Sequence, residues 1–169
     1  MVTRSMALAS SSIVVLTLVA GINVTPFAEE PTAPLAGVWR TVQVVVSGAP
    51  GRTYRPEATL AIFHGRHYSR IEVHAEQARP LLADPATASA DQLRAVWGPF
   101  VGEGGTFELT GDHTLTMHAT VAKNPAAMMP GASSVFTYTR DGDLLTLKEV
   151  LADAGPSANG ITVTLSRVE

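Results

Sequence analysis

Hydrophobic and polar residues alternate along most of the chain with a period of two. Apolar side chains take every second position in several runs, for example Ile161, Val163 and Leu165 near the C-terminus. This alternation is typical of a β-strand with one buried face. The pattern predicts eight strands, near residues 35–48, 59–63, 68–74, 105–110, 114–122, 133–139, 143–150 and 160–168.

Short turns that contain glycine separate many of these runs. "HGR" at residues 64–66, Gly111 with Asp112, and "RDGD" at residues 140–143 each stand between two alternating segments. An Asp-Gly pair in this position is one of the stronger local signals for a hairpin. Sequential strands joined by short turns can close into an antiparallel up-and-down barrel, which leaves no exposed edge. With eight strands, such a barrel is either filled by side chains or holds one small ligand.

One segment departs from the period of two and predicts a short helix. Residues 88–97 include Ser89 and Gln92 at the spacing of a capping box, and apolar residues follow at helical intervals. Gly98 and Pro99 end the segment. We therefore expect an all-β fold with one short helix between the third and fourth predicted strands.

The N-terminal segment has the composition of an export signal. Residues 1–28 contain Arg4, no acid before Glu29, and a mostly apolar run over residues 13–24. This run is shorter than the roughly 20 apolar residues that a spanning helix needs, so a signal peptide is the preferred interpretation. Residues 29–34 then form a short linker, and residues 35–169 form one barrel domain. We expect an exported protein, periplasmic or secreted, with no stable membrane span after leader removal; tethering by an uncleaved leader is the alternative.

The composition excludes several classes of function. The net charge is −3, with 46% hydrophobic and 16% charged residues, as expected for one ordinary soluble domain. The basic residues are scattered singly, so nucleic acid is not an expected partner. Cysteine is absent, which excludes disulfides, thiolate catalysis and Cys-ligated zinc. The oligomeric state does not follow from the sequence.

Residues with catalytic or metal-binding chemistry are few. The G-x-S-x-G motif of serine hydrolases does not occur. His64 and His67 could hold a metal with a third ligand, and His74 or His118 could bind haem, but solvated turn histidines are the simpler interpretation. We therefore expect no catalytic residue, no metal and no cofactor.

The first and last predicted strands carry a pattern that suits a closed barrel. Gly37 and Trp39 stand on the first strand, and Arg167 stands on the last. Closure makes these strands neighbours, so the Arg167 guanidinium can lie over the Trp39 indole in a cation–π pair. Gly37 would allow a backbone to approach closely. We expect these three residues to have a structural role without catalytic content.

From Leu35 onwards the chain resembles the bacterial lipocalin-like domain family of calycin-type β-barrels. The similarity is carried in order by "LAGVWR", "HYSRI", "ARPLLA", "GGTFEL", "KNP", "TYTRDGDLLTL" and "SRVE". It implies a lipocalin-like barrel that binds or carries a small hydrophobic or amphipathic molecule. The alternatives are a small isomerase or cyclase that acts on a hydrophobic substrate in the barrel, and a filled structural barrel with no ligand.

The third predicted strand has two chemically different faces. One face carries Tyr68, Arg70, Glu72 and His74, and the other carries Ser69, Ile71 and Val73. A buried charge must be paired to offset its desolvation, so we expect the apolar face inside and Arg70 on the surface, beside Glu72 or another acid.

The opposite orientation of this strand defines the candidate ligand site. An inward Arg70 with Tyr68 beside it would place a cation and a hydroxyl in an apolar pocket suited to a carboxylate-bearing amphipath. His74 belongs to the same face. Trp97 and Phe100, on the helix and the loop after it, would then cover the mouth of the barrel.

Overall fold

The computed structural model describes residues 34–152, 155–156 and 160–169. The predicted leader at residues 1–28 and nearly all of the linker lie outside the described residues. The described elements are β1 (Gly37–Val46), β2 (Arg52–Tyr54), β3 (Ala58–His64), β4 (His67–Val73), α1 (Ala90–Trp97), β5 (Phe100–Thr110), β6 (Thr114–Ala122), the 3₁₀ helix η1 (Pro125–Met128), β7 (Ser134–Asp141), β8 (Leu144–Ala152), β9 (Gly155–Pro156) and β10 (Ile161–Arg167).

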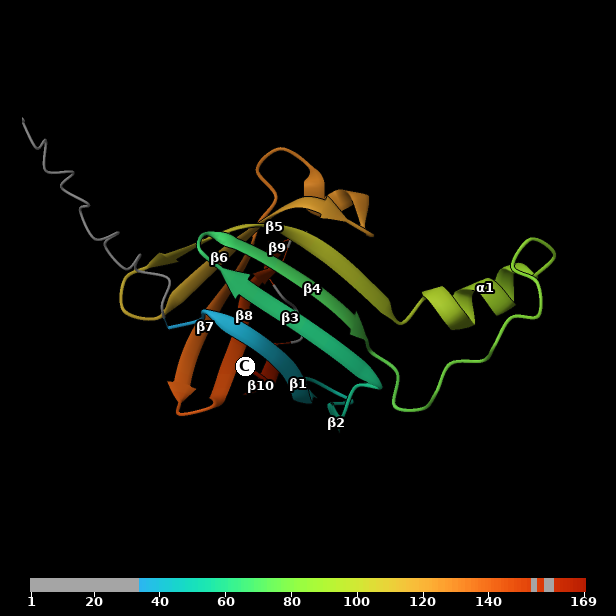
Figure 1. Ribbon diagram of the computed structural model, residues 1–169, viewed down its shortest axis with the longest axis horizontal. Coiled ribbons are helices and arrows are strands. Elements are labelled where there is room, and N and C mark those ends of the chain that lie inside the picture. The colour runs from blue at the N-terminus through green and yellow to red at the C-terminus, as the bar shows by residue number, and fades with distance from the viewer. Residues whose placement is uncertain (1–33, 153–154, 157–159) are drawn as a thin grey trace, which may run out of the picture.

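Eight of the strands close into an antiparallel barrel (Figure 1). The strand order is β10, β1, β3, β4, β5, β6, β7 and β8, and β10 also pairs with β8. This last pairing joins the two ends of the sheet, so the predicted all-β, eight-stranded antiparallel barrel is confirmed. The short strands β2 and β9 are additions beside β1 and β8.

The predicted glycine turns close three of the hairpins. Gly65, Gly111 and Gly142 have φ angles of 55°, 57° and 55°. Glycine adopts this left-handed conformation without the steric penalty that a Cβ would bring. Each turn connects two neighbouring strands, as in the pair formed by His64 and His67 on either side of Gly65.

The helix has the predicted capping box, but its position in the strand order is different. The Ser89 side chain accepts a hydrogen bond from the Gln92 backbone, and the Gln92 side chain accepts one from the Ser89 backbone. The helix follows the fourth strand, β4, and not the third, because β2 was not predicted. β2 has only three residues and lies between Gly51 and Pro56, so the alternation pattern gives no signal for it.

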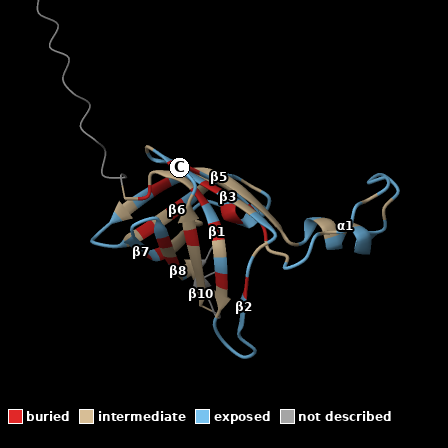
Figure 2. Cartoon of the chain, turned by 60° about the horizontal axis from the view of Figure 1, so that its bottom comes forward, coloured by how far each residue is buried: buried red, intermediate tan, exposed pale blue. Residues whose placement is uncertain are grey.

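The two ends of the barrel differ in how their strands are connected. We call the end that contains the turns at Gly65, Gly111 and Gly142 the closed end, and the opposite end, where β4 and β6 finish and β5 begins, the open end. The apolar core includes Leu35, just before β1, and side chains from strands all around the barrel, among them Trp39, Phe63, Phe107, Leu115, Leu145 and Leu165. Figure 2 shows that buried residues lie along the strands of the barrel, whereas α1 contains no buried residue and projects away from the barrel.

Within the described residues, none of the helices has the length and apolar character that a membrane crossing requires.

Candidate functional site

The contact predicted between the first and last strands is present at the closed end. Trp39 and Arg167 are register partners on β1 and β10, and the Arg167 guanidinium carbon lies 5.3 Å from the centre of the indole ring. The guanidinium of Arg140 lies 5.7 Å from the same ring. Trp39 is fully buried, and its indole N–H donates to the Leu35 carbonyl at 2.8 Å. Trp39, Arg140 and Arg167 do not line any of the three hollows described for the structure, which agrees with the structural role expected for this contact.

Gly37 occupies a position that a larger residue could not take without strain. Its φ angle is 134°, and a Cβ there would lie 2.6 Å from the Arg167 side chain and 2.7 Å from the Glu169 carbonyl oxygen. The Arg167 side chain also donates to the Ala36 carbonyl. The glycine therefore allows the C-terminal residues to pass against the start of β1, as the sequence suggested.

The expected orientation of strand 68–74 is wrong, and the opposite face points into the barrel. Tyr68 and Glu72 are buried, whereas Ile71 is 51% exposed on the outer surface. Arg70 and Glu72 line a cavity inside the barrel together with core residues such as Phe136. The reason is that the barrel supplies partners for every charge on this face, which removes the desolvation argument against it.

The first of these partners is Glu103 on the neighbouring strand β5. The Arg70 Nε donates to the Glu103 Oε1 at 2.8 Å, and the Tyr68 hydroxyl donates to the same oxygen at 3.2 Å. Arg70 and Glu103 are direct register partners, so both side chains point inward from adjacent strands. The guanidinium is therefore already paired with an acid of the protein, and it is not the isolated cation that a ligand carboxylate would need.

A second polar cluster lies beside the first. The His74 Nε2 lies 2.8 Å from the Glu72 Oε2, and the His74 Nδ1 lies 2.8 Å from the Tyr54 hydroxyl. The Thr41 hydroxyl donates to the other Glu72 oxygen at 3.4 Å. A neutral His74 with its proton on Nε2 would satisfy both ring contacts at once. His74 is thus held by residues of the protein on both sides of its ring.

The buried charges stabilise one another. Burial alone would raise the pKa of Glu72, but the hydrogen bond to His74 and the charge of Arg70 outweigh it and hold the pKa of this carboxyl below its ordinary value. Burial would likewise lower the pKa of Arg70, and the charges of Glu72 and Glu103 raise it instead. Burial raises the pKa of Tyr54, so this phenol stays protonated. These groups form a paired set rather than a free acid or base.

The cavity inside the barrel is small. It is lined by Arg70 and Glu72 at one side and by apolar residues elsewhere, and its volume is about 20 Å³. This is room for about one water molecule. The barrel interior at this depth is therefore filled by side chains.

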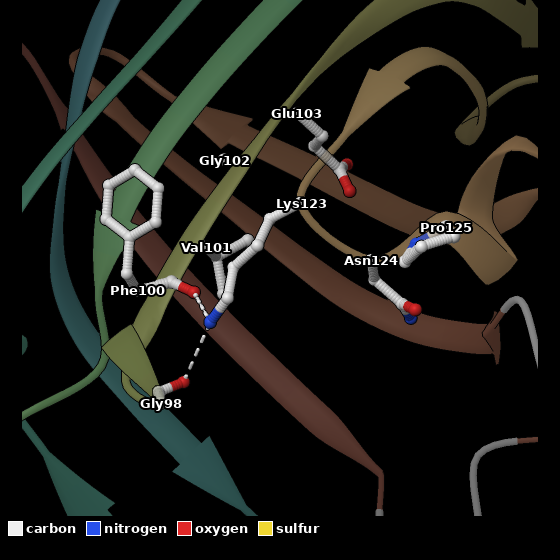
Figure 3. A pocket seen from close by; sticks show the side chains of 8 residues that line it. All are labelled: Gly98, Phe100, Val101, Gly102, Glu103, Lys123, Asn124 and Pro125. Carbon is white, nitrogen blue, oxygen red and sulfur yellow. Dashed lines mark hydrogen bonds between the residues drawn. The ribbon is translucent and has the colours of Figure 1, made fainter. Parts of the chain in front are cut away.

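A larger hollow lies at the open end, and we call it the mouth hollow (Figure 3). Its volume is about 400 Å³, and its lining comes from the start of β5 and the segment after β6: Gly98, Phe100, Val101, Gly102, Glu103, Lys123, Asn124 and Pro125. The Lys123 ammonium donates to the carbonyl oxygens of Trp97, Gly98 (3.3 Å) and Phe100 (2.8 Å). Glu103 lines the mouth hollow and also forms the ion pair with Arg70.

Trp97 and Phe100 lie together, but they do not cover the cavity that Arg70 lines. Their rings meet edge to face with centroids 5.9 Å apart. Phe100 lines the mouth hollow, whereas Trp97 lines a second hollow of about 380 Å³ beside α1, with Arg79 and Leu81. Trp97 remains 51% exposed.

The sequence analysis missed three residues that shape this site. Tyr54 stands on the unpredicted β2, and Glu103 and Lys123 belong to the two segments that form the mouth hollow. Glu103 lies in the part of β5 that precedes the predicted strand at residues 105–110, so the sequence pattern did not identify it as the register partner of Arg70. Among the described residues, no group of three or more acidic, histidine or cysteine side chains could hold a metal ion.

This chain was compared with family models, curated proteins and solved structures. No family model matches it, and no curated protein matches it. Among solved structures it is similar to a redesigned β-barrel, with 15% sequence identity, a TM-score of 0.42, and coverage of 82% of this chain and 95% of that chain. The similarity is distant, so the assignment of a closed eight-stranded barrel stands on the strand pairings described above.

Proposed function

We propose that the protein is a lipocalin-like barrel that binds a small hydrophobic or amphipathic molecule in the mouth hollow at its open end. The observation that carries this proposal is the hollow itself. Its volume of about 400 Å³ lies within the range of small-molecule sites, and the surface of its lining is mainly apolar with a few polar groups. The interior cavity of about 20 Å³ is too small for such a ligand.

The surroundings of the mouth hollow support a preformed site. Glu103 is fixed by hydrogen bonds from Tyr68 and Arg70, and Lys123 is fixed by the carbonyls at the start of β5. In the described part of the chain, no buried side-chain nitrogen or oxygen lacks a hydrogen-bond partner. A site whose polar groups are already oriented loses less entropy when a ligand binds.

Export is part of the same proposal and rests on the sequence. The basic, acid-free start and the apolar run at residues 13–24 are typical of a signal peptide. The mature chain is expected to begin between Gly21 and Glu29. The intact mass of the protein isolated from its native host tests this expectation, and a full-length cytoplasmic species would contradict it.

A filled barrel with no ligand is the second candidate, and the small interior cavity favours it. In this case the open end would be an ordinary irregular surface, and the mouth hollow would remain occupied by water. The barrel would then act as a rigid structural module.

Native mass spectrometry of protein purified from its own cell envelope separates the two candidates. A co-purified small molecule is expected with the wild type and with Val121→Trp, which changes an exposed residue of β6. Val101→Trp places a large side chain in the mouth hollow and should abolish the co-purification. Retention of the molecule in Val101→Trp would place the ligand outside the mouth hollow and contradict the proposal. The absence of any bound molecule in the wild type would favour the filled barrel.

A further inference from the structure

The polar groups that line or border the mouth hollow differ in how many of their hydrogen-bonding positions are occupied by other groups of the protein. The Lys123 ammonium has three protons and donates to three carbonyl oxygens, those of Trp97, Gly98 and Phe100. Asn124 accepts a hydrogen bond from the Ala126 backbone with its side-chain oxygen. The cation that faces the hollow is therefore engaged by the protein itself.

Glu103 is the acidic residue of this lining, and its hydrogen bonds converge on one atom. The Tyr68 hydroxyl and the Arg70 Nε both donate to Oε1. An ionised carboxylate has acceptor sites on both oxygens. Figure 3 shows the Glu103 carboxylate pointing away from β5 into the space beside the Asn124–Pro125 segment. The Oε2 atom thus offers acceptor capacity at the edge of an apolar hollow.

We infer that the mouth hollow selects an uncharged amphipath whose head group donates a hydrogen bond, such as a long-chain alcohol, to the carboxylate of Glu103. This inference rests on the proposed function of the same hollow and specifies its ligand. It replaces the carboxylate-bearing amphipath that the sequence analysis linked to an inward Arg70, because Arg70 is paired and Glu103 would repel a second carboxylate.

The charges around the hollow also disfavour a cationic head group. Arg70 is bonded to Glu103 and already neutralises its charge, and Lys123 adds a second cation to the same lining. A protonated amine would approach both. A hydroxyl group avoids this repulsion and still donates the hydrogen bond that the carboxylate can accept. A neutral donor is therefore the chemical class that fits the lining best.

Four probes with the same ten-carbon chain test this inference: 1-decanol, decyl methyl ether, decanoate and decylammonium. Isothermal titration of the wild type below the micelle concentrations should give the tightest binding for 1-decanol. The ether, which cannot donate, should bind at least about 10-fold more weakly, as expected for a lost hydrogen bond to a charged group. Decanoate and decylammonium should also bind more weakly than the alcohol.

Two variants locate the effect. Glu103→Gln removes the charge and should reduce the preference for 1-decanol over the ether by about 10-fold. Glu108→Gln makes the same change at an exposed position of the same strand and should leave the preference unchanged. Circular dichroism checks that both variants fold. If Glu103→Gln fails to fold, the order of the four probes on the wild type decides the question alone.

The outcomes separate this inference from the proposed function. Binding of the ten-carbon chains with equal affinity for alcohol and ether, or with a preference for decanoate or decylammonium, would overturn the inference and leave the binding function standing. No binding of any of the four probes would overturn both. Preference for 1-decanol that survives in Glu103→Gln would place the acceptor elsewhere and would also overturn the inference.

Discussion

The two ends of the barrel are built from different chemistry. At the closed end, Trp39, Leu115 and Leu145 are completely buried among other apolar side chains. Toward the open end, inward positions carry Arg70, Glu72 and Glu103, and the mouth hollow lies beside them. Apolar packing at one end provides the stability of the fold, and paired charges at the other end provide a defined polar surface.

This difference has a physical cause. Burial of apolar area stabilises the fold by roughly 25 cal/mol per Å², without requiring a particular direction of contact. Buried charges contribute little net stability, because desolvation offsets most of their attraction. A barrel can therefore hold charges at one end when the other end supplies the stability. Substitutions at the two ends should have unequal effects.

The largest effect is expected at Trp39. Trp39→Ala removes a fully buried indole and should lower the free energy of unfolding by about 3 to 5 kcal/mol. Trp97→Ala, in the half-exposed position on α1, is the matched control and should change it by less than about 1 kcal/mol. Urea denaturation followed by far-UV circular dichroism measures both. Equal losses would show that the closed end is not the main source of stability.

The next largest effect is expected at Gly37. Gly37→Ala introduces a Cβ at a φ angle of 134° and against Arg167 and Glu169, which should cost about 1 to 3 kcal/mol. Gly65→Ala also has a positive φ, but a Cβ there would have nothing within 4 Å. The difference between the two variants in urea denaturation isolates the contact with the C-terminal residues. A greater loss for Gly65→Ala would contradict the proposed close approach.

A smaller effect is expected from Arg167. Arg167→Ala should destabilise the protein less than Trp39→Ala, and the double variant should show a coupling energy of about 0.5 to 2 kcal/mol. The guanidinium lies 5.3 Å from the indole centre, so the two losses cannot be independent. A double-mutant cycle by thermal or urea unfolding gives the coupling. Strictly additive losses would be incompatible with this contact.

The pH dependence of stability should show the smallest effect, because it comes from the shift of one carboxyl group. The pKa of Glu72 is lower in the folded protein than its ordinary value of 4.5, so its contribution is complete above that value. The contribution is lost as the pH falls through the lower folded pKa. Glu72→Gln should therefore lose less stability than the wild type on acidification from about pH 5 to pH 3.

The matched control for this acid titration is Glu108→Gln, an exposed residue of β5. Its stability should fall with pH in the same way as that of the wild type. Urea denaturation at several pH values compares the three proteins. A parallel loss in all three would show that Glu72 is not stabilised in its ionised form.

The sequence predicted the barrel because its evidence is local. Alternation gave the main strands, and glycines such as Gly65 and Gly142 gave the hairpin turns. β5 begins at Phe100, whereas the predicted strand began at residue 105. The prediction started too late because Gly102, Gly104 and Gly105 interrupt the alternation. Glycine provides no side chain to reveal a face, so the first half of this strand had no local signal.

The candidate site was harder to predict because its contacts join distant segments. Alternation assigns Arg70 and Ile71 to opposite faces of the strand, but it does not predict which of the two faces points inward. The partner that makes an inward Arg70 favourable is Glu103, 33 positions along the chain. Whether a ligand space exists depends on how tightly side chains fill the barrel, and this is a property of the packing. Of the predicted ligand-site residues, Phe100 lines the mouth hollow, and the rest of its lining had no counterpart in the sequence pattern.

The central claim, that the closed end is structural and the open end binds a ligand, is tested most directly by amide chemical shifts. A ¹H–¹⁵N correlation spectrum should be recorded during titration with 1-decanol. Shift changes should concentrate at Val101, Glu103 and Lys123, and the amides of Trp39 and Leu145 should keep their positions. The largest changes at the closed end, or no changes at any amide, would contradict this division.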